Sequence, residues 1–549
     1  MLSRFAIFIL TVFIVFLACS CTGENEAEIY FTDGDLDSET ALEDMEVSES
    51  VDGNSEIAAE DREELLEDDG EIEEIDPYDY PDGSHSRNRA QDIAYLIVTD
   101  ESMTDAFDVL AQWKIRKGIP TVVRTMQEII EVSEGVDEAE KLRNYIIEMF
   151  DNEPLQWVLL GGDTPLVPHR EFWAEVSLAG QYDASGTIAS DLYFADLDGS
   201  WDDNGNGIWG EMEDNLDLWA ELYVSRAPVD NSEEAAGFIA KTMAYEQNPP
   251  EDFIHNAVFI SENTGFSGLD SSLGLNPLAG HFPDDYSIRK LYLGYDHYAD
   301  AEPNKYSNQW DAFSSGPGFF AHFGHGSGKD VAALHLDDIH RLDNGPKNGI
   351  FVSTACLSGG FHNHDQSGGE AIVVNPNGGT VAYFGNTEVG IGFPSGMNYI
   401  YEVYKTLFDD RHPVYRLAEL YTVARENFTA KENLYKETHT SRWTVMEMVL
   451  FGEPEMQVWA DDPTQIEATH LGLVRLGKNR YMVQVESDGE ALEAAQVSIS
   501  ADGLLISEYT DEDGQADLRF ELSGDINGLS LTVTKDQYRP LLDEIEIEE

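Results

Sequence analysis

The stretches GFFAHFGHGSG, residues 318–328, and GIFVSTACLSGG, residues 349–360, decide the fold class. Each begins with a short apolar run and continues into a turn of small residues, the pattern of a buried strand that ends at a tight turn. His325 lies in the first turn and Cys356 in the second. We therefore expect both side chains to project from the same edge of a sheet.

The pattern around these two stretches alternates between strands and helices. Helices are expected up to Lys117, from Asp137 to Phe150, where Asp137 and Glu140 have capping-box spacing, and between about Met397 and Leu450. The other expected strands are YLIVTD (95–100), PTVVRT (120–125), WVLLGGD (157–163), AVFISEN (257–263), GTVAYFGNT (379–387) and the closing FGEPEMQVW (451–459). This alternation predicts an α/β domain over residues 89–462, a parallel sheet with helices on both faces. In such sheets ligands gather at the carboxyl ends of the strands.

Beyond Asp462 the helical pattern disappears. Short alternating runs such as YMVQV, AQVSIS, ADLRFEL and LSLTV follow, punctuated by DG pairs. They predict an all-β, immunoglobulin-like sandwich over residues 463–549.

The first 21 residues combine an early cation with an apolar run that ends in small residues, the layout of a secretory signal. Cys19 and Cys21 lie where a bacterial lipoprotein signal places the lipid-modified thiol. An ordinary cleaved signal and an uncleaved anchor are the alternatives. Residues 22–88 are strongly acidic and predict a disordered stalk, or else a propeptide. We expect an exported protein on the bacterial cell envelope, held to the membrane by lipid or released.

The charge balance and the cysteine count of the chain exclude some classes of function. The 549 residues carry 106 acidic and 32 basic side chains, a formal net charge of -74, which would repel nucleic acid and anionic headgroups. Such an acidic composition is compatible with calcium-rich or salty surroundings or with a cationic substrate, and it can also serve solubility alone. Of three cysteines, two belong to the signal, so the mature part holds Cys356 alone and forms no internal disulfide. A lone thiol in an exported protein needs burial or a chemical role.

Cys356 and His325 together suggest nucleophilic catalysis. A neighbouring imidazole shifts a thiol toward the thiolate and can later protonate a leaving amine. The adjacent glycines let backbone amides approach a developing oxyanion, and the amides of Gly326 and Cys356 are the candidates. The alternative is a core histidine beside a buried, inert cysteine.

GHGS, followed 31 residues after His325 by AC and a glycine-containing turn, resembles the His and Cys motifs of the gingipain family of cysteine peptidases. The similarity continues through WVLLGGDTPLVPHR, SDLYFADLDG, LYVSRAPVDN and FGEPEMQVW and covers most of residues 90–549. This resemblance implies a caspase-like fold, shared with clostripain and legumain. It also implies a cysteine endopeptidase that acts on proteins or peptides through a His/Cys dyad, with no cofactor in catalysis.

Two acidic residues gain roles from the same resemblance. Asp191 matches the family position that orients the catalytic imidazole, although it could equally cap a helix or turn. Asp217 resembles the aspartate that selects arginine at the base of the primary pocket in arginine-specific members. Asp214 and Glu221 lie close by in the sequence, so the pocket residue is open among them. The implied preference is cleavage after Arg or Lys.

A calcium site is predicted from spacing. Its ligands would be Asp202, Asn204, Asn206, the Ile208 carbonyl and Glu213, with Gly207 at the turn, which satisfies the twelve-residue calcium-loop pattern. Flanking helices are not evident, so the loop would stand alone and the calcium would be structural. Asp196 and Asp198 are candidates for the same ion or a second one. An ordinary acidic surface loop is the alternative.

Three further residues receive weaker interpretations. His362 and His364 could suggest a transition metal, but without a third ligand they fit an exposed loop or a pocket rim better. Asp163, at the end of LLGGD, fits a structural role. Two rival functions remain: a catalytically silent surface adhesin or binding module on the same fold, and a metal-dependent hydrolase.

Overall fold

The computed structural model describes residues 85–177, 183–214, 216–262, 271–363, 366–431, 439–524, 526 and 528–548. The predicted signal, nearly all of the acidic segment and His364 lie outside these residues. Within the described ranges, no helix is both long enough and apolar enough to cross a bilayer.

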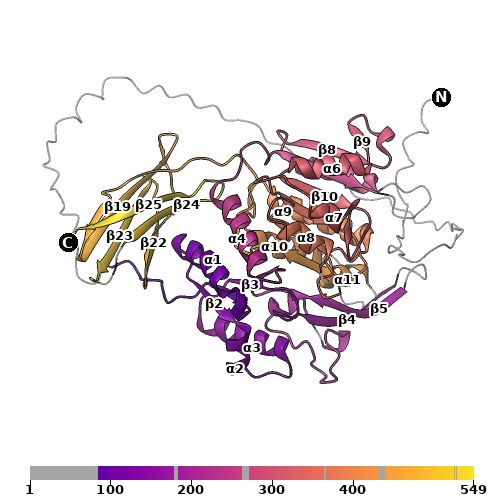
Figure 1. Ribbon diagram of the computed structural model, residues 1–549, viewed down its shortest axis with the longest axis horizontal. Coiled ribbons are helices and arrows are strands. Elements are labelled where there is room, and N and C mark those ends of the chain that lie inside the picture. Colours follow the sequence, from indigo (N-terminus) through magenta and orange to yellow (C-terminus); the bar gives the residue numbers. More distant parts are fainter. Residues whose placement is uncertain are drawn as a thin grey trace, which may run out of the picture. The chain divides into compact units, whose positions relative to one another are not determined.

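An eleven-stranded sheet forms the centre of the α/β part (Figure 1). Across the sheet the order is β2 (Thr121–Thr125), β1 (Tyr95–Thr99), β3 (Trp157–Gly161), β6 (Tyr223–Ala227), β16 (Met448–Phe451), β15 (Ala382–Asn386), β14 (Ile350–Ser353), β10 (Phe319–Phe323), β7 (Asn256–Ser261), β8 (Ser287–Tyr292) and β9 (Ala301–Pro303). Every residue of β1, β3, β10, β14 and β15 is buried, as expected for strands covered on both faces.

The sheet departs from the prediction at one junction. Neighbouring strands are parallel throughout except for β15 and β16, which pair antiparallel. The strand direction therefore reverses once. The predicted closing strand 451–459 was wrong as well, since β16 ends at Phe451. Gly452 then adopts a φ of 148°, and Pro454 has no N–H to donate.

Helices contact one another in two larger groups and in one further pair, formed by the helices over residues 126–132 and 138–152. The first runs from α1 (Thr104–Arg116) to α4 (Ser232–Gln247), α8 (Gly368–Val374) and α7 (Leu336–Ile339), and the second joins α9 (Met397–Leu407), α10 (Leu417–Thr429) and α11 (Thr440–Glu447) (Figure 1). The remaining α-helices are α2 (Met126–Val132), α3 (Glu138–Asn152), α5 (Ser272–Leu275) and α6 (Tyr306–Ser315). At α3 the side chain of Asp137 accepts from the amide of Glu140, the N-cap that the sequence predicted.

Smaller strands lie outside the main sheet. β4 (Arg170–Ser177) and β5 (Asp183–Ser190) form a hairpin, and β11 (Gly326–Ser327), β12 (Asp330–Val331) and β13 (Leu334–His335) form a small antiparallel sheet next to His325.

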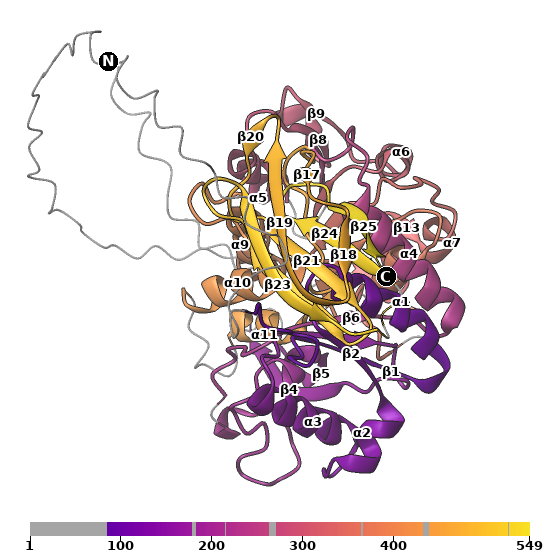
Figure 2. The same cartoon turned by 90° about the vertical axis from the view of Figure 1, so that its left-hand side faces the viewer.

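The C-terminal part is all-β (Figure 2). It has its own hydrophobic cluster. One sheet contains β17 (Glu467–Thr469), β19 (Gly477–Ser487), β20 (Glu490–Ala491) and β23 (Gln515–Leu522). The other contains β18 (Leu473–Arg475), β25 (Leu541–Glu548), β24 (Leu529–Thr534), β21 (Gln496–Ala501) and β22 (Leu504–Tyr509). Two sheets with separate edges fit the predicted sandwich, while its immunoglobulin topology stays a prediction.

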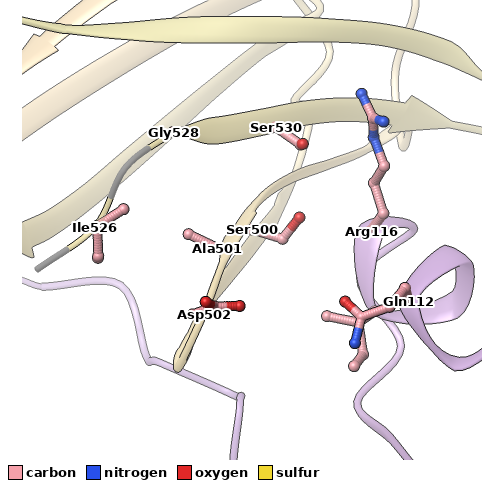
Figure 3. A pocket seen from close by; sticks show the side chains of 9 residues that line it. Gln112, Arg116, Ser500, Ala501, Asp502, Ile526, Gly528 and Ser530 are labelled. Atoms are coloured by element: carbon pink, nitrogen blue, oxygen red, sulfur yellow. The ribbon is translucent and has the colours of Figure 1, made fainter. Parts of the chain in front are cut away.

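Polar contacts join this part to the α/β part. Arg416 pairs with Asp536 at 2.7 Å, and Arg116 with Glu544 at 2.9 Å. A cavity of about 370 Å³ lies beside the second pair, lined from α1 by Gln112, Ile115 and Arg116 and from the β part by residues that include Ser500 and Asp502 (Figure 3). No residue of 318–328 or 349–360 lines it, so this cavity belongs to the joint and not to the predicted site.

A buried cluster of ion pairs connects α1 with α4 and with residues 453–455, which follow β16. The Nζ of Lys114, which is inaccessible to solvent, lies 3.0 Å from Glu246, 2.5 Å from Glu453 and 2.7 Å from Glu455. Lys117 pairs with Glu246 at 2.7 Å and with Glu455 at 2.6 Å. The three carboxylates lie close enough together to hold a metal ion, but the two lysine ammonium groups and the guanidinium of Arg416, 2.9 Å from Glu455, already neutralise them.

Candidate active site

Three adjacent parallel strands end at one edge of the sheet in chemically capable side chains. Glu262 follows the end of β7 directly, His325 lies two residues after β10, and Cys356 lies three residues after β14. Neighbouring strands are about 4.8 Å apart, so residues at the carboxyl ends of three such strands share one small region.

The turn that carries His325 packs directly against the turn that carries Cys356. A Cβ atom added to Gly326 would lie 2.6 Å from the Cβ of Ala355 and 3.2 Å from the carbonyl oxygen of Cys356. No side chain fits into that space. Glycine at position 326 is therefore what allows the two turns to approach so closely.

Backbone hydrogen bonds fix the turn around Cys356. Thr354 N donates to His322 O (3.1 Å), Ala355 N to Ser353 Oγ (3.1 Å) and Leu357 N to Glu388 O (2.8 Å). Leu357 adopts a φ of 58°, the left-handed region that a leucine rarely occupies. The Cys356 thiol is 2% exposed, and its Sγ lies 3.9 Å from the carbonyl oxygen of Gly390. A rigid, locally strained turn thus presents the thiol.

Glu262 is a member of this site that the sequence analysis did not single out. Its Oε2 accepts a hydrogen bond from the backbone amide of His325 at 2.8 Å and lies 3.6 Å from Nε2 of His322. Burial opposes ionisation of this carboxyl, but the His322 ring and the His325 amide prevail and lower its pKa to about 2. Its position near the carboxyl end of the predicted strand AVFISEN (257–263) was the available signal.

Asp191 pairs with a buried arginine, and its role beside the imidazole stays a prediction. Both of its carboxylate oxygens accept from the buried guanidinium of Arg226, at 2.8 Å and 2.6 Å. The same guanidinium also donates to the carbonyl oxygens of Gly162 and Val167. Asp191 therefore neutralises a buried arginine. The turn that begins at Asp191 is capped by Ser190, whose Oγ accepts from the amide of Leu192.

Asp217 is exposed, and its Oδ1 accepts from the amide of Trp219 at 3.0 Å. Its charge acts on Asp196, where burial first, and then the charges of Asp217 and Glu221, raise the pKa to about 7. The described contacts thus associate Asp217 with an acidic cluster before β6.

The predicted calcium loop satisfies many of its own amides. Asp202 Oδ1 accepts from the amides of Asn206 (2.9 Å) and Gly207 (3.2 Å), and Asn206 Oδ1 accepts from the amide of Ile208 (2.7 Å). Glu213, expected to close the loop, is exposed. The buried carboxylate at that end is the next residue, Asp214, which accepts from the amides of Glu211 (3.0 Å) and Asn204 (3.5 Å). At that end of the loop Asp214, and not Glu213, is thus the buried carboxylate, and the calcium loop stays a prediction.

A carboxylate cluster next to that loop fits a cation better. Ligand oxygens of Asp196, Asp198 and Glu221 all lie within 4.8 Å of one another. Asp196 is 1% exposed, and neither of its carboxylate oxygens accepts a hydrogen bond. A buried carboxylate without a partner is costly, and a hard cation such as Ca²⁺ would satisfy Asp196 together with the two more exposed carboxylates.

His362 lies beside the site. Its Nε2 is 3.6 Å from Glu388 Oε1, and its ring lies against those of Phe361 and His169. Among the described residues, no group of three potential metal ligands includes His362. Asp163 is buried, and burial raises its pKa to about 7.

Comparison with known proteins places this site in a family. The chain matches the model of peptidase family C25 over residues 88–459, more than half of its length. The crystal structure of the Arg-specific cysteine proteinase gingipain R (RgpB) shares the fold at 18% identity and a TM-score of 0.67, covering 85% of this chain and 100% of that one. The complex of Porphyromonas gingivalis RgpB pro- and mature domains matches at 18% identity and a TM-score of 0.64, covering 83% and 100%.

A structure described as a protease also matches, at 16% identity and a TM-score of 0.65, covering 83% of this chain and 97% of that one. No curated protein matches the chain. At such identities the solved structures show the fold alone, and the family model supplies the membership. The chain belongs to peptidase family C25, the gingipain family, and is a cysteine-type peptidase that acts on protein or peptide substrates.

Proposed function

We propose that this chain is an endopeptidase in which Cys356 is the nucleophile and His325 its proton-transfer partner. The observation that supports the assignment is the meeting of Glu262, His325 and Cys356 at the ends of β7, β10 and β14. A silent adhesin on the same fold has no need of a thiol and an imidazole on two turns in contact.

The reaction follows from these groups. His325 takes the thiol proton as Cys356 Sγ attacks the peptide carbonyl carbon, and the amides of Gly326 and Cys356 stabilise the oxyanion. His325 then protonates the amine as the C–N bond breaks, which leaves a thioester. Water attacks the thioester, gives a proton to His325 and releases the acid and the thiol. Glu262 takes the positioning role first considered for Asp191, because it holds the His325 backbone.

We further propose cleavage after Arg or Lys. Gingipain R is described as Arg-specific, and a net charge of -74 concentrates cationic peptides near the protein. Asp217 stays the proposed pocket carboxylate; it is exposed, and its charge also acts on Asp196. Profiling with a peptide library tests the preference directly.

Calcium is proposed as a structural ion held by Asp196, Asp198 and Glu221. The buried, unpartnered carboxylate of Asp196 supports this ligand set over the loop set of Asp202 to Glu213. The ion would neutralise the cluster and would stabilise the connection into β6.

Export and a lipid anchor on Cys19 or Cys21 also stay proposals, together with an acidic stalk and an immunoglobulin-like C-terminal domain from residue 463. Metabolic labelling with a palmitate analogue, in Cys19→Ala and Cys21→Ala variants, tests the anchor. Labelling that persists in each of the two variants would show that neither thiol is the sole acceptor of the lipid.

The catalytic proposal is tested with Cys356→Ala and His325→Ala. Each should abolish cleavage of a peptide library without a change in melting temperature, and the double variant should lose no more than either single one. Iodoacetamide should alkylate wild-type Cys356 at mildly acidic pH and react far more slowly in His325→Ala. Substantial turnover by Cys356→Ala protein would refute the assignment.

A further inference from the structure

His322 connects the two turns that carry the catalytic pair. It lies in β10, its ring is inaccessible to solvent, and Nδ1 lies 2.9 Å from Ser353 Oγ. Ser353 Oγ in turn accepts from the amide of Ala355, the residue before Cys356. One side of the imidazole thus reaches the cysteine turn through a single hydroxyl group.

The other side of the ring reaches the histidine turn. Nε2 of His322 lies 3.6 Å from Glu262 Oε2, the same oxygen that accepts from the amide of His325 at 2.8 Å. A separation of 3.6 Å is too long for a hydrogen bond, so this contact is electrostatic. The chain of contacts therefore runs from the backbone of His325 through Glu262, His322 and Ser353 to the backbone of Ala355.

The backbone of His322 adds a second link to the cysteine turn, because its carbonyl oxygen accepts from the amide of Thr354 at 3.1 Å. Gly324 lies beside the contact between Glu262 and His322. A Cβ atom there would lie 2.6 Å from Glu262 Oε2 and 2.6 Å from His322 Nε2. Only a glycine leaves room for the imidazole and the carboxylate to face each other.

The network assigns the hydrogens on the ring. A carboxylate can only accept, so the nitrogen that faces Glu262 carries a proton. The other nitrogen, Nδ1, lies 2.9 Å from Ser353 Oγ, which accepts from the amide of Ala355. Nε2 faces the Glu262 carboxylate without a hydrogen bond, whereas the Nδ1 side is joined to the cysteine turn through Ser353 Oγ.

We propose that His322 is a positioning residue for the cleavage reaction, holding the turns of His325 and Cys356 in register. The inference rests on the proposed function. Misplacing one reacting group by about 1 Å costs on the order of a hundredfold in rate, so loss of the link should lower kcat much more than it raises KM.

The test compares His322→Ala, Ser353→Ala and the double variant. His322→Ala should lower kcat by about ten- to a hundredfold with KM within about twofold, and should slow alkylation of Cys356 at mildly acidic pH. The two single losses should not add, because both break one chain. His322→Asn, which keeps a polar atom near the place of Nδ1, should recover part of the rate.

Phe320→Leu is the matched control. Phe320 is buried two residues earlier on the same strand and packs on Phe313 and Phe351, and its side chain has no polar atom with which to join the network. It should lower the melting temperature with little effect on kcat. Wild-type kcat in His322→Ala, additive losses in the double variant, or an equal loss in Phe320→Leu at matched stability would each overturn the proposal.

The proposed function fails separately, if wild-type protein cleaves no member of the library or Cys356→Ala protein remains active. Even then the alkylation rate of Cys356 in His322→Ala decides whether the two turns are coupled.

Discussion

Replacing Glu262 with Gln removes one charge and little volume from the centre of the site. The carboxyl has a pKa of about 2 in place of the ordinary 4.5, which corresponds to roughly 3 kcal/mol of preference for the ionised form in the folded protein. Because the folded pKa is depressed, this stabilisation is present above the unfolded pKa and is lost as the pH falls from about 4.5 toward about 2.

We therefore expect Glu262→Gln to lower the free energy of unfolding at pH 7 by up to roughly 3 kcal/mol, and the difference from wild type to shrink below pH 4.5. Since the glutamine holds the His325 amide less firmly, kcat should fall by about tenfold or more. Denaturant unfolding at several pH values and kinetics on a fluorogenic peptide measure both effects.

Glu388→Gln is the control for Glu262→Gln. Glu388 also follows a strand of the same edge, but its carboxylate faces His362 at 3.6 Å. Its effect on kcat should be small. Equal stability and equal kcat for Glu262→Gln and wild type at pH 7 would refute the reasoning.

The other predictions concern groups outside the catalytic pair. Asp191→Asn should destabilise the fold by about 3–5 kcal/mol, because it leaves the buried guanidinium of Arg226 uncompensated, while alkylation of Cys356 stays near the wild-type rate. Slowed alkylation at unchanged stability would instead support a role for Asp191 in the catalytic site. A chelator should lower the melting temperature of the wild-type and Glu213→Gln proteins but not that of Asp196→Asn, and added Ca²⁺ should restore the melting temperature of the first two. Chelator sensitivity in Asp196→Asn would place the ion elsewhere. Lys114→Met should cost about 3–5 kcal/mol in denaturant unfolding, since it leaves three buried carboxylates with too few cations, and a change below about 1 kcal/mol would contradict the cluster's role.

Local patterns predicted most of the elements because each is a local physical property. Apolar runs such as YLIVT and WVLLG are buried strands, and Asp137 caps its helix as the spacing indicated. The reversal of direction between β15 and β16 could not be predicted in this way. An apolar run looks the same in a parallel and in an antiparallel pair, and only the path of the intervening helices decides.

For the site, the sequence by itself singled out the two candidate reactive residues, since a lone thiol and a histidine each follow a buried strand and enter a turn of small residues. It also singled out an acidic segment as a candidate calcium site. Only the tertiary structure decided the partners of the carboxylates, because charge pairing depends on which strands are neighbours and not on spacing along the chain. Asp191 binds Arg226, and Glu262 accepts from the amide of His325. In the acidic segment, the buried carboxylate without a hydrogen-bond partner is Asp196.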